Sequence, residues 1–293
     1  KKWLDWDEFL GVVKSIKDDL LYEIHRWEES QAEAEVEDEA EAETGAERQN
    51  KKRLSKVSSK SKLKSVLKTE FTPTQRRIAT MFQGYLILAF LSYIPDRQRT
   101  FRELQLNKTF FRDKRTNCWT IKHGPDDYKT GSTYGDRPPL VLAEELTPAI
   151  DDFLQRWRPC LNPRSGNDDD NDSNDNTKDD NNNKNNNNES GSGDHFFVQP
   201  RTGRPFTQDT VYNLVARSCY KYTGKKTNPH LLRDMIVTHV RNSDDASERE
   251  LEALALYMGH SITMQRTSYD RRTMGQKVAP AVQLLQSVNK KAS

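Results

Sequence analysis

The sequence has few cysteines, no long apolar run and no visible secretory signal. The 293 residues include three cysteines, Cys118, Cys160 and Cys219, spaced too widely for a compact zinc motif or a disulfide scaffold. A reducing, intracellular environment is therefore expected. The best apolar run, residues 85–93, falls well short of the roughly 18 residues that span a bilayer, which argues against a membrane helix. The chain opens at Lys1 rather than Met, which is compatible with a fragment of a longer protein.

The chain as a whole also carries little net charge. The 46 Lys and Arg residues nearly balance the 44 Asp and Glu residues, leaving a net charge of +2. Two low-complexity segments hide a contrast, because residues 31–68 carry +1 and residues 167–189 carry −6, so the remainder carries +7. A basic folded part suits a polyanion such as nucleic acid, and an ordinary basic surface is the alternative.

Two inserts interrupt what is otherwise a single predicted domain over residues 1–293. An amphipathic helix is predicted over residues 1–29, where apolar residues recur at steps of three and four. The charged segment 30–69 and the Asn/Asp-rich segment 163–194 are expected to be disordered. The basic half of the first insert is either a solvated linker or a contact to a DNA backbone.

The remaining pattern is typical of a mainly helical α+β fold with a small antiparallel sheet. One helix is predicted from Thr72-Pro73, a capping residue followed by proline, to just before Pro95. Turn residues separate two strand-like runs. Further helices are predicted over residues 97–106 and 147–157 and after Phe206, and the strands over residues 118–122 and 139–142.

An ordered set of reactive side chains stands out near the C-terminus. Asn228-Pro229 predicts a helix start that carries His230 and Arg233 on one face, near the positive end of the helix dipole. A capping box, Ser247 with Glu250, predicts the next helix, and Gly259 can close it in the left-handed conformation, so that His260 follows at the helix exit. Tyr269 lies nine residues beyond His260.

These residue types suit phosphodiester transfer through a tyrosyl intermediate. Arginine stays protonated and binds the equatorial oxygens of a phosphate in two-point contacts. A phenol loses its proton only near pH 10 in water, so the Tyr269 nucleophile needs a base or cations beside it. His230 is the candidate for assisting proton removal, and His260 for donating a hydrogen bond to the phosphate. Each motif alone is weak, and their joint order and spacing carry the hypothesis.

The set resembles the tyrosine recombinase/integrase family, whose pattern is an early arginine, a hairpin lysine, His-x-x-Arg, Gly-His and a tyrosine nine residues on. His230, Arg233, Gly259, His260 and Tyr269 match it. The hairpin lysine maps best to Lys129, with Lys122 as the alternative, and the early arginine to Arg97, with Arg99 as the alternative.

The resemblance implies a tyrosine-recombinase-like catalytic domain that cuts and rejoins double-stranded DNA, as in integration or excision of a mobile element. It implies that Arg97 and Arg233 hold the phosphate, Lys129 protonates the leaving 5′ oxygen, and neither a metal nor a cofactor takes part. It also implies assembly on DNA as a tetramer, a location on DNA inside the cell, and a core-binding domain that is either absent or upstream of Lys1. In the family the tail after Tyr269 often docks on a neighbouring protomer, and packing on its own domain is the alternative.

Three other functions remain as alternatives. The first keeps the chemistry and makes the chain a type IB topoisomerase-like or telomere-resolving enzyme. The second is a domesticated, non-catalytic DNA-binding protein, which the atypical spacing after Arg97 allows. The third is a metal-dependent transposase or nuclease, which needs converging carboxylates such as Asp126-Asp127.

Overall fold

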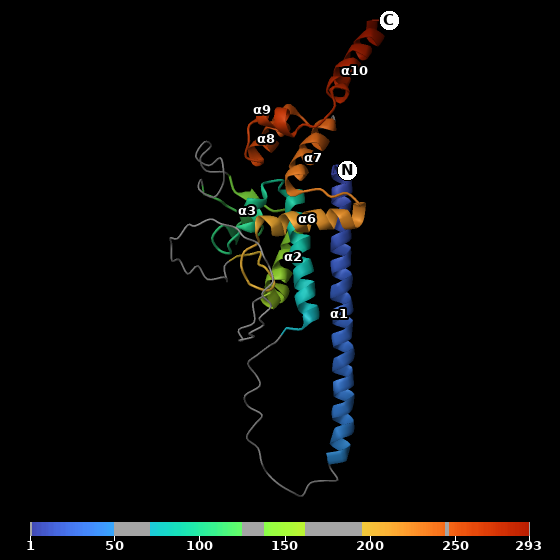
Figure 1. The fold of residues 1–293 in the computed structure, drawn as a ribbon, viewed down its shortest axis with the longest axis vertical. Coiled ribbons are helices and arrows are strands. Elements are labelled where there is room, and N and C mark those ends of the chain that lie inside the picture. Colours follow the sequence, from blue (N-terminus) through green and yellow to red (C-terminus); the bar gives the residue numbers. More distant parts are fainter. Residues whose placement is uncertain (1, 50–70, 125–137, 162–194, 244–245, 293) are drawn as a thin grey trace, which may run out of the picture.

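The computed structural model describes residues 2–49, 71–124, 138–161, 195–243 and 246–292, and helices dominate it (Figure 1). Short 3-10 turns at Glu144–Leu146 and Arg158–Leu161, and π-helical turns at Phe153–Trp157 and Gln265–Tyr269, complete the helical part. The α-helices of the described residues are α1 (Trp6–Gln49), α2 (Pro73–Tyr93), α3 (Gln98–Arg102), α5 (Thr147–Asp152), α6 (Gln208–Thr223), α7 (Pro229–Asn242), α8 (Glu248–Tyr257), α9 (Ile262–Met264) and α10 (Met274–Ala292).

A small antiparallel sheet accompanies the helices, as the sequence predicts. Its strands are β1 (Phe110–Arg112), β2 (Trp119–Ile121) and β3 (Leu140–Val141), in the order β1-β2-β3. Phe110 pairs with Ile121, and Thr120 pairs with Val141. The sequence predicted β2 and β3 but missed β1, because three residues are too few for an alternating pattern to be recognised.

Helix α2 lies at the centre of the core. Its start is the predicted one: the Thr72 hydroxyl accepts a hydrogen bond from the backbone N–H of Gln75, and the Gln75 side chain accepts one from the backbone N–H of Thr72. Phe90, in the last turns of α2, packs its ring against those of Phe101, Phe196 and neighbouring phenylalanines. Apolar residues on most of its surface are buried, as expected for a helix covered on all sides.

Helix α1 is longer than the sequence predicted. It continues to Gln49, well beyond the expected end at residue 29, so the expectation of disorder is wrong for residues 30–49. Alanine and glutamate are strong helix formers, which explains the extension through a segment with no apolar face. Phe9 and Leu20 bury the first half against the core, and Figure 1 shows the second half running past the N-terminal end of α2.

Acidic side chains of α1 form ion pairs with bases from several other elements. The carboxylate of Glu8 lies 2.7 Å from the Lys225 ammonium, and Glu28 accepts a 2.6 Å contact from Arg156. Asp19 binds both Lys221 and the hydroxyl of Tyr222, and Glu23 binds Arg77. Partly exposed pairs of this kind contribute only about 0–1 kcal/mol each, so their main effect is on the register of α1.

The helix predicted over residues 97–106 is also corrected. Helix α3 covers only Gln98–Arg102, with Arg97 at its N-cap. Beyond it the backbone N–H of Gln105 donates to the Thr109 hydroxyl, and Gln105 pairs with His195 in an isolated bridge. These contacts replace helical hydrogen bonds and turn the chain toward β1.

The segment that follows the second predicted insert packs beside the segment that precedes it. Arg158 donates hydrogen bonds to the backbone carbonyls of His195 and Phe196. The buried Gln83 amide binds both backbone groups of Val198, at 3.0 and 2.8 Å. The rest of the two predicted inserts, residues 50–69 and 163–194, lies outside the described residues.

Helix α10 points away from the remainder of the described chain (Figure 1). The predicted helical tail is present, and its apolar residues Val278, Val282 and Leu285 are 45%, 48% and 62% exposed. These three side chains therefore do not pack on their own domain. Within the described residues, no helix combines the length and apolar character needed to cross a membrane.

Candidate active site

Tyr269 lies at the end of a π-helical turn, in contact with three of the other predicted site residues. Its ring stacks on that of His260, with centroids 4.6 Å apart and an interplanar angle of 18°. The ring of His230 meets it edge-on at 6.1 Å, and Cζ of Arg233 lies 5.3 Å from its centroid. The fold therefore brings together four side chains that the sequence spreads over forty positions.

His230 and Arg233 are delivered by the first turns of α7, as predicted. The Asn228 side chain accepts hydrogen bonds from the backbone N–H groups of His230 and Leu231, both at 3.0 Å, and Pro229 follows the cap. His230 is exposed at the surface, whereas Arg233 retains only 1% of its accessible area. One helix start thus supplies an accessible imidazole and a buried cation.

His260 is delivered by the exit of α8. The predicted capping box of Ser247 and Glu250 begins the helix, and Gly259 ends it at φ +69°. The N–H of His260 then reaches back to the carbonyl of Ala255 at 3.0 Å, which closes the helix end. A left-handed residue is needed here, so glycine positions the imidazole.

Burial and neighbouring cations keep the His260 ring neutral. Burial, followed by the charge of Arg233, lowers the pKa of His260 to about 4. Its Nδ1 lies 3.3 Å from the carbonyl of Ser261, which can only accept, so Nδ1 carries the proton and Nε2 is an acceptor. Within the described residues Nε2 is buried and has no partner. Donation from Nε2 to a phosphate, the predicted role, requires a second proton, which an anion beside the ring would favour.

Arg233 is held by a buried carboxylate that the sequence reading missed. Its Nη1 donates to Oδ1 of Asp96 at 3.0 Å, and its Nη2 donates to the carbonyl of Met258 at 2.9 Å. Both side chains of the Arg233–Asp96 pair are 1% exposed. The remaining Nε of Arg233 is buried without a partner among the described residues. Such an atom is suited to an incoming acceptor, because an unpaired buried donor is costly.

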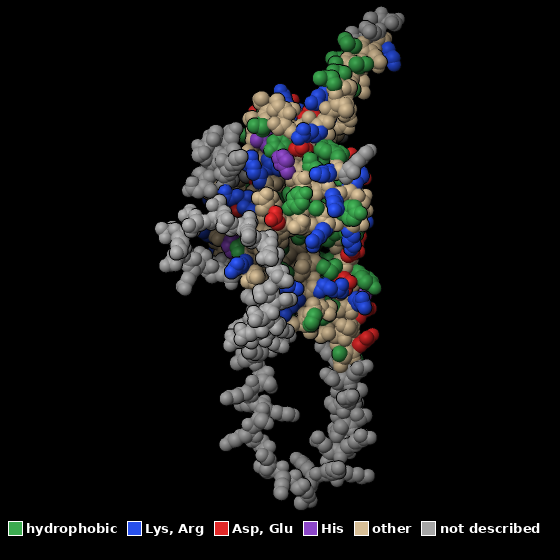
Figure 2. Space-filling view, viewed as in Figure 1, with side chains coloured by type: hydrophobic (Ala, Val, Ile, Leu, Met, Phe, Trp, Pro, Cys, Tyr) green, Lys and Arg blue, Asp and Glu red, His purple; other side chains and the backbone are tan. Residues whose placement is uncertain are grey.

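A cavity of about 430 Å³ opens beside these residues and is rich in cations. It is lined by Arg97, Gln98, Arg99, Arg102, Gln208, Pro229, His230 and Arg233. Figure 2 shows histidine side chains next to a group of Lys and Arg side chains over the region of α3 and the start of α7.

Ion pairs at the cavity distinguish between the two candidates for the early arginine. Arg99 forms an ion pair with Glu103 at 2.8 Å, and Arg102 binds the same carboxylate at 3.0 Å. The Arg97 guanidinium, in contrast, has no carboxylate partner among the described residues, and its charge contributes to lowering the pKa of His260. Of the two arginines, only Arg97 has a guanidinium that no described carboxylate pairs with, which favours it over Arg99.

The preferred candidate for the general acid lies outside the described residues. Lys129 falls in residues 125–137, outside the described ranges. The alternative, Lys122, follows β2 with an exposed side chain and does not line the cavity. Its backbone N–H donates to the carbonyl of Thr109 at 2.9 Å. The hairpin lysine remains a prediction for either residue.

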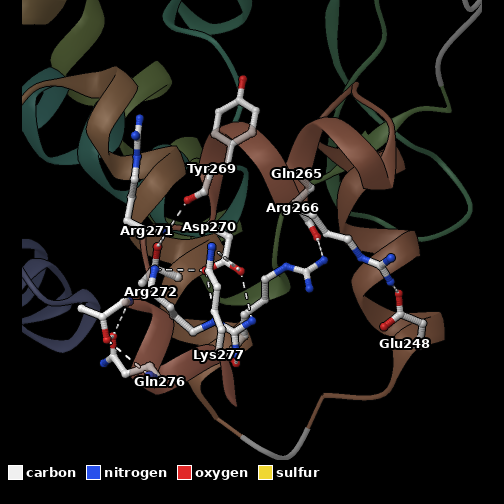
Figure 3. Close-up of polar contacts among 12 residues, drawn as sticks. Glu248, Gln265, Arg266, Tyr269, Asp270, Arg271, Arg272, Gln276 and Lys277 are labelled. Atoms are coloured by element: carbon white, nitrogen blue, oxygen red, sulfur yellow. Dashed lines mark hydrogen bonds and ion pairs between the residues drawn. The ribbon is translucent and has the colours of Figure 1, made fainter. Parts of the chain in front are cut away.

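A polar network behind Tyr269 anchors its backbone (Figure 3). The Thr238 hydroxyl donates to the carbonyl of Tyr269 at 3.3 Å. Asp270 binds the Arg272 guanidinium through both oxygens at 3.0 Å, and Arg271 binds the buried Asp234 at 2.9 Å. In Figure 3 the Tyr269 ring points away from these contacts. In the sequence, the run Asp270-Arg271-Arg272 directly after the tyrosine was the feature that could have indicated this network.

A metal centre of protein ligands is not formed by the described part of the chain, where no three His, Cys, Asp or Glu side chains converge. Comparison with family models, with curated proteins and with solved structures gave no match to this chain.

Proposed function

We propose that this chain is a tyrosine-type recombinase that cuts and rejoins double-stranded DNA at specific sites. The observation that carries the proposal is the contact of Tyr269 with His260 and Arg233 beside a cavity lined by Arg97 and His230. A nucleophile, imidazole groups and cations with unused donors are the groups that transfer of a phosphodiester requires.

In the proposed reaction the phenol oxygen of Tyr269 attacks the scissile phosphorus. The bond from phosphorus to the 5′ oxygen breaks, and a 3′-phosphotyrosyl bond replaces it. The phenol proton passes to an imidazole, that of His230 or His260, and the hairpin lysine, Lys129 or Lys122, protonates the departing 5′ oxygen. Attack by the 5′ hydroxyl of a second strand reverses these steps, so bond energy is conserved.

Arg97 and Arg233 are the proposed ligands of the nonbridging phosphate oxygens. The charge that builds up on these oxygens in the transition state is stabilised by guanidinium groups placed beside them. Arg233 is fixed by its two hydrogen bonds, and Arg97 emerges from the N-cap of α3 at the cavity.

The proposed partners are double-stranded DNA and further copies of the same chain, assembled as a tetramer on DNA inside the cell. Self-association is supported by the exposed apolar residues of α10, which extends from the body of the protein.

A covalent trap tests the proposed function. The protein is incubated with fragmented DNA of its source in the presence of EDTA, then denatured, and the DNA that stays attached is sequenced. Attached fragments that share one junction are expected with the wild type. Tyr269→Phe should retain non-covalent DNA binding and give no adduct, whereas Tyr212→Phe, at an exposed tyrosine of α6, should behave like the wild type.

Each other outcome points to a different function. Adducts formed by Tyr269→Phe would refute the tyrosyl assignment. DNA binding without any wild-type adduct would favour a non-catalytic DNA-binding protein, and cleavage that EDTA abolishes would favour a metal-dependent nuclease. Relaxation of supercoiled plasmid without paired sites would favour a type IB topoisomerase-like enzyme.

A further inference from the structure

We infer that Asp96 is a positioning residue that sets the relative placement of Arg97 and Arg233, the two arginines of the proposed phosphate site. The inference rests on the proposed function and adds to it a residue outside the motifs that suggested that function.

One carboxylate oxygen of Asp96 joins the two arginines. Oδ1 accepts the 3.0 Å hydrogen bond from Nη1 of Arg233 and a 2.7 Å hydrogen bond from the backbone N–H of Arg97. The guanidinium of one arginine and the backbone from which the other emerges are therefore bound to the same atom. A shift of Asp96 therefore changes the spacing between the Arg233 guanidinium and the backbone that carries Arg97.

The position of the carboxylate is itself fixed. Oδ2 of Asp96 accepts a 2.9 Å hydrogen bond from the Thr100 hydroxyl, one turn along α3. Asp96 and Arg233 are both 1% exposed, so water does not compete for these contacts. In such surroundings charge-assisted hydrogen bonds are short and directional, which restricts the orientation of Arg233.

The arginines around the cavity also differ in whether a carboxylate pairs with them. Asp96 pairs with Arg233, and Arg99 and Arg102 share the single Glu103 carboxylate, while Arg97 has no carboxylate partner among the described residues. A phosphate that enters the cavity would then bind Arg97, whose guanidinium has no carboxylate partner among the described residues, and the free Nε of Arg233 as an oriented donor.

Two substitutions separate geometry from charge. Asp96→Asn keeps the length of the side chain, and its oxygen can accept from Arg233 and from the Arg97 N–H, but it removes the charge. Asp96→Glu keeps the charge and displaces the carboxylate by one methylene. The quantities to measure are the rate of covalent adduct formation in a single turnover and, separately, the dissociation constant for DNA with Tyr269→Phe added.

A positioning role predicts a rate for Asp96→Asn within about fivefold of the wild type and a loss of about 100-fold for Asp96→Glu and Asp96→Ala, with the dissociation constant changed by less than about threefold. In an Arg233→Ala background, Asp96→Ala should add little further loss, since without Arg233 no spacing between the two arginines remains for Asp96 to set. Asp151→Ala is the matched control: its carboxylate also binds two donors, Arg112 and Trp119, but lies outside the cavity, so the rate should not change.

A full rate for Asp96→Ala would overturn the inference, as would an active Asp96→Glu with an inactive Asp96→Asn, because charge compensation alone would then explain the pair. Failure of all three variants to fold would also overturn it, since Asp96 would be required by the fold. If the wild type forms no adduct that depends on Tyr269, the proposed function fails instead, and the two failures are distinguishable.

Discussion

The phenol ring of Tyr269 lies nearly parallel to the imidazole of His260, with centroids 4.6 Å apart. Arg233 approaches the same ring, so the proposed nucleophile, a proposed phosphate ligand and an imidazole form one packed unit. Val237 and Met258 complete a small buried cluster with Tyr269, separate from the main core. The site therefore contributes to stability as well as to the proposed chemistry.

This packing predicts different effects for two substitutions of Tyr269. Tyr269→Phe retains the ring contacts and should change the free energy of unfolding by less than about 1 kcal/mol. Tyr269→Ala leaves a cavity at a position that is 8% exposed and should cost about 3 kcal/mol. Urea unfolding followed by circular dichroism measures both values, and equal losses would show that the hydroxyl rather than the ring stabilises the cluster.

The pairing of the cavity arginines predicts that Arg97 and Arg99 differ in function. Arg97→Ala removes a cation with unused donors and should slow adduct formation by about 10²–10³-fold. Arg99→Ala removes a partly exposed guanidinium that Glu103 already binds, and should slow it by less than about threefold. The test is the single-turnover rate of adduct formation by each variant on the trapped junction sequence. A larger loss for Arg99→Ala than for Arg97→Ala would identify Arg99 as the early arginine.

The low pKa of His260 predicts a loss of stability in acid. The folded-state pKa of about 4 lies below the ordinary value of 6.5. As the pH falls from 6.5 to 4, His260 therefore binds a proton in the unfolded chain but not in the folded chain. At about 1.4 kcal/mol per pH unit, the free energy of unfolding should fall by about 2–3 kcal/mol between pH 7 and pH 4.5. Stability from this residue is complete above pH 6.5 and is lost below it.

The comparison with His260→Gln isolates this contribution. Burial acts to raise the pKa of Asp270, but hydrogen bonds and the charge of Arg272 hold it below its ordinary value. Protonation of such carboxylates in acid destabilises the wild type and the variant equally, so their contribution cancels in the difference. Urea unfolding of both proteins at the two pH values should show a smaller decrease for the variant. Parallel decreases would mean that His260 titrates normally.

Two glycines in the same conformation offer a matched test of how His260 is placed. Gly259 and Gly224 both have φ +69°, and each follows the end of a helix. Substitution by alanine at either position should cost about 1–2 kcal/mol of folding free energy, because a Cβ strains the left-handed backbone. Only Gly259→Ala should also slow adduct formation, since it shifts the neighbouring His260. Equal rates for the two variants would argue against that link.

Local signals in the sequence were sufficient for much of the fold. The caps at Thr72, Asn228 and Ser247 lie within a few residues of the groups they bind, so the starts of α2, α7 and α8 could be predicted. The same local geometry, with Gly259 at the end of α8, explains why the motif spacing indicated a cluster around Tyr269.

The features that were missed depend on distant contacts. Asp96 and Arg233 are 137 positions apart, and nothing in the sequence around Asp96 shows that it will be buried beside an arginine. The sequence already favoured Arg97 over Arg99, and the ion pair of Arg99 with Glu103 adds a structural reason for that choice. The first half of the charged segment was misjudged because composition was read as disorder, although alanine and glutamate favour a helix.

The contacts of Arg158 with His195 and Phe196, and of Gln83 with Val198, have a consequence for how such a gene can vary. They bind the described segments on either side of residues 162–194 to each other and to α2, so these contacts do not depend on the length of chain that joins the two ends. Lengthening that connection costs only a closure entropy that rises with the logarithm of its length, about 0.6 kcal/mol for each doubling. Insertions and deletions at this point are therefore nearly neutral for folding, and the same position is a natural place to introduce an affinity tag or a reporter domain.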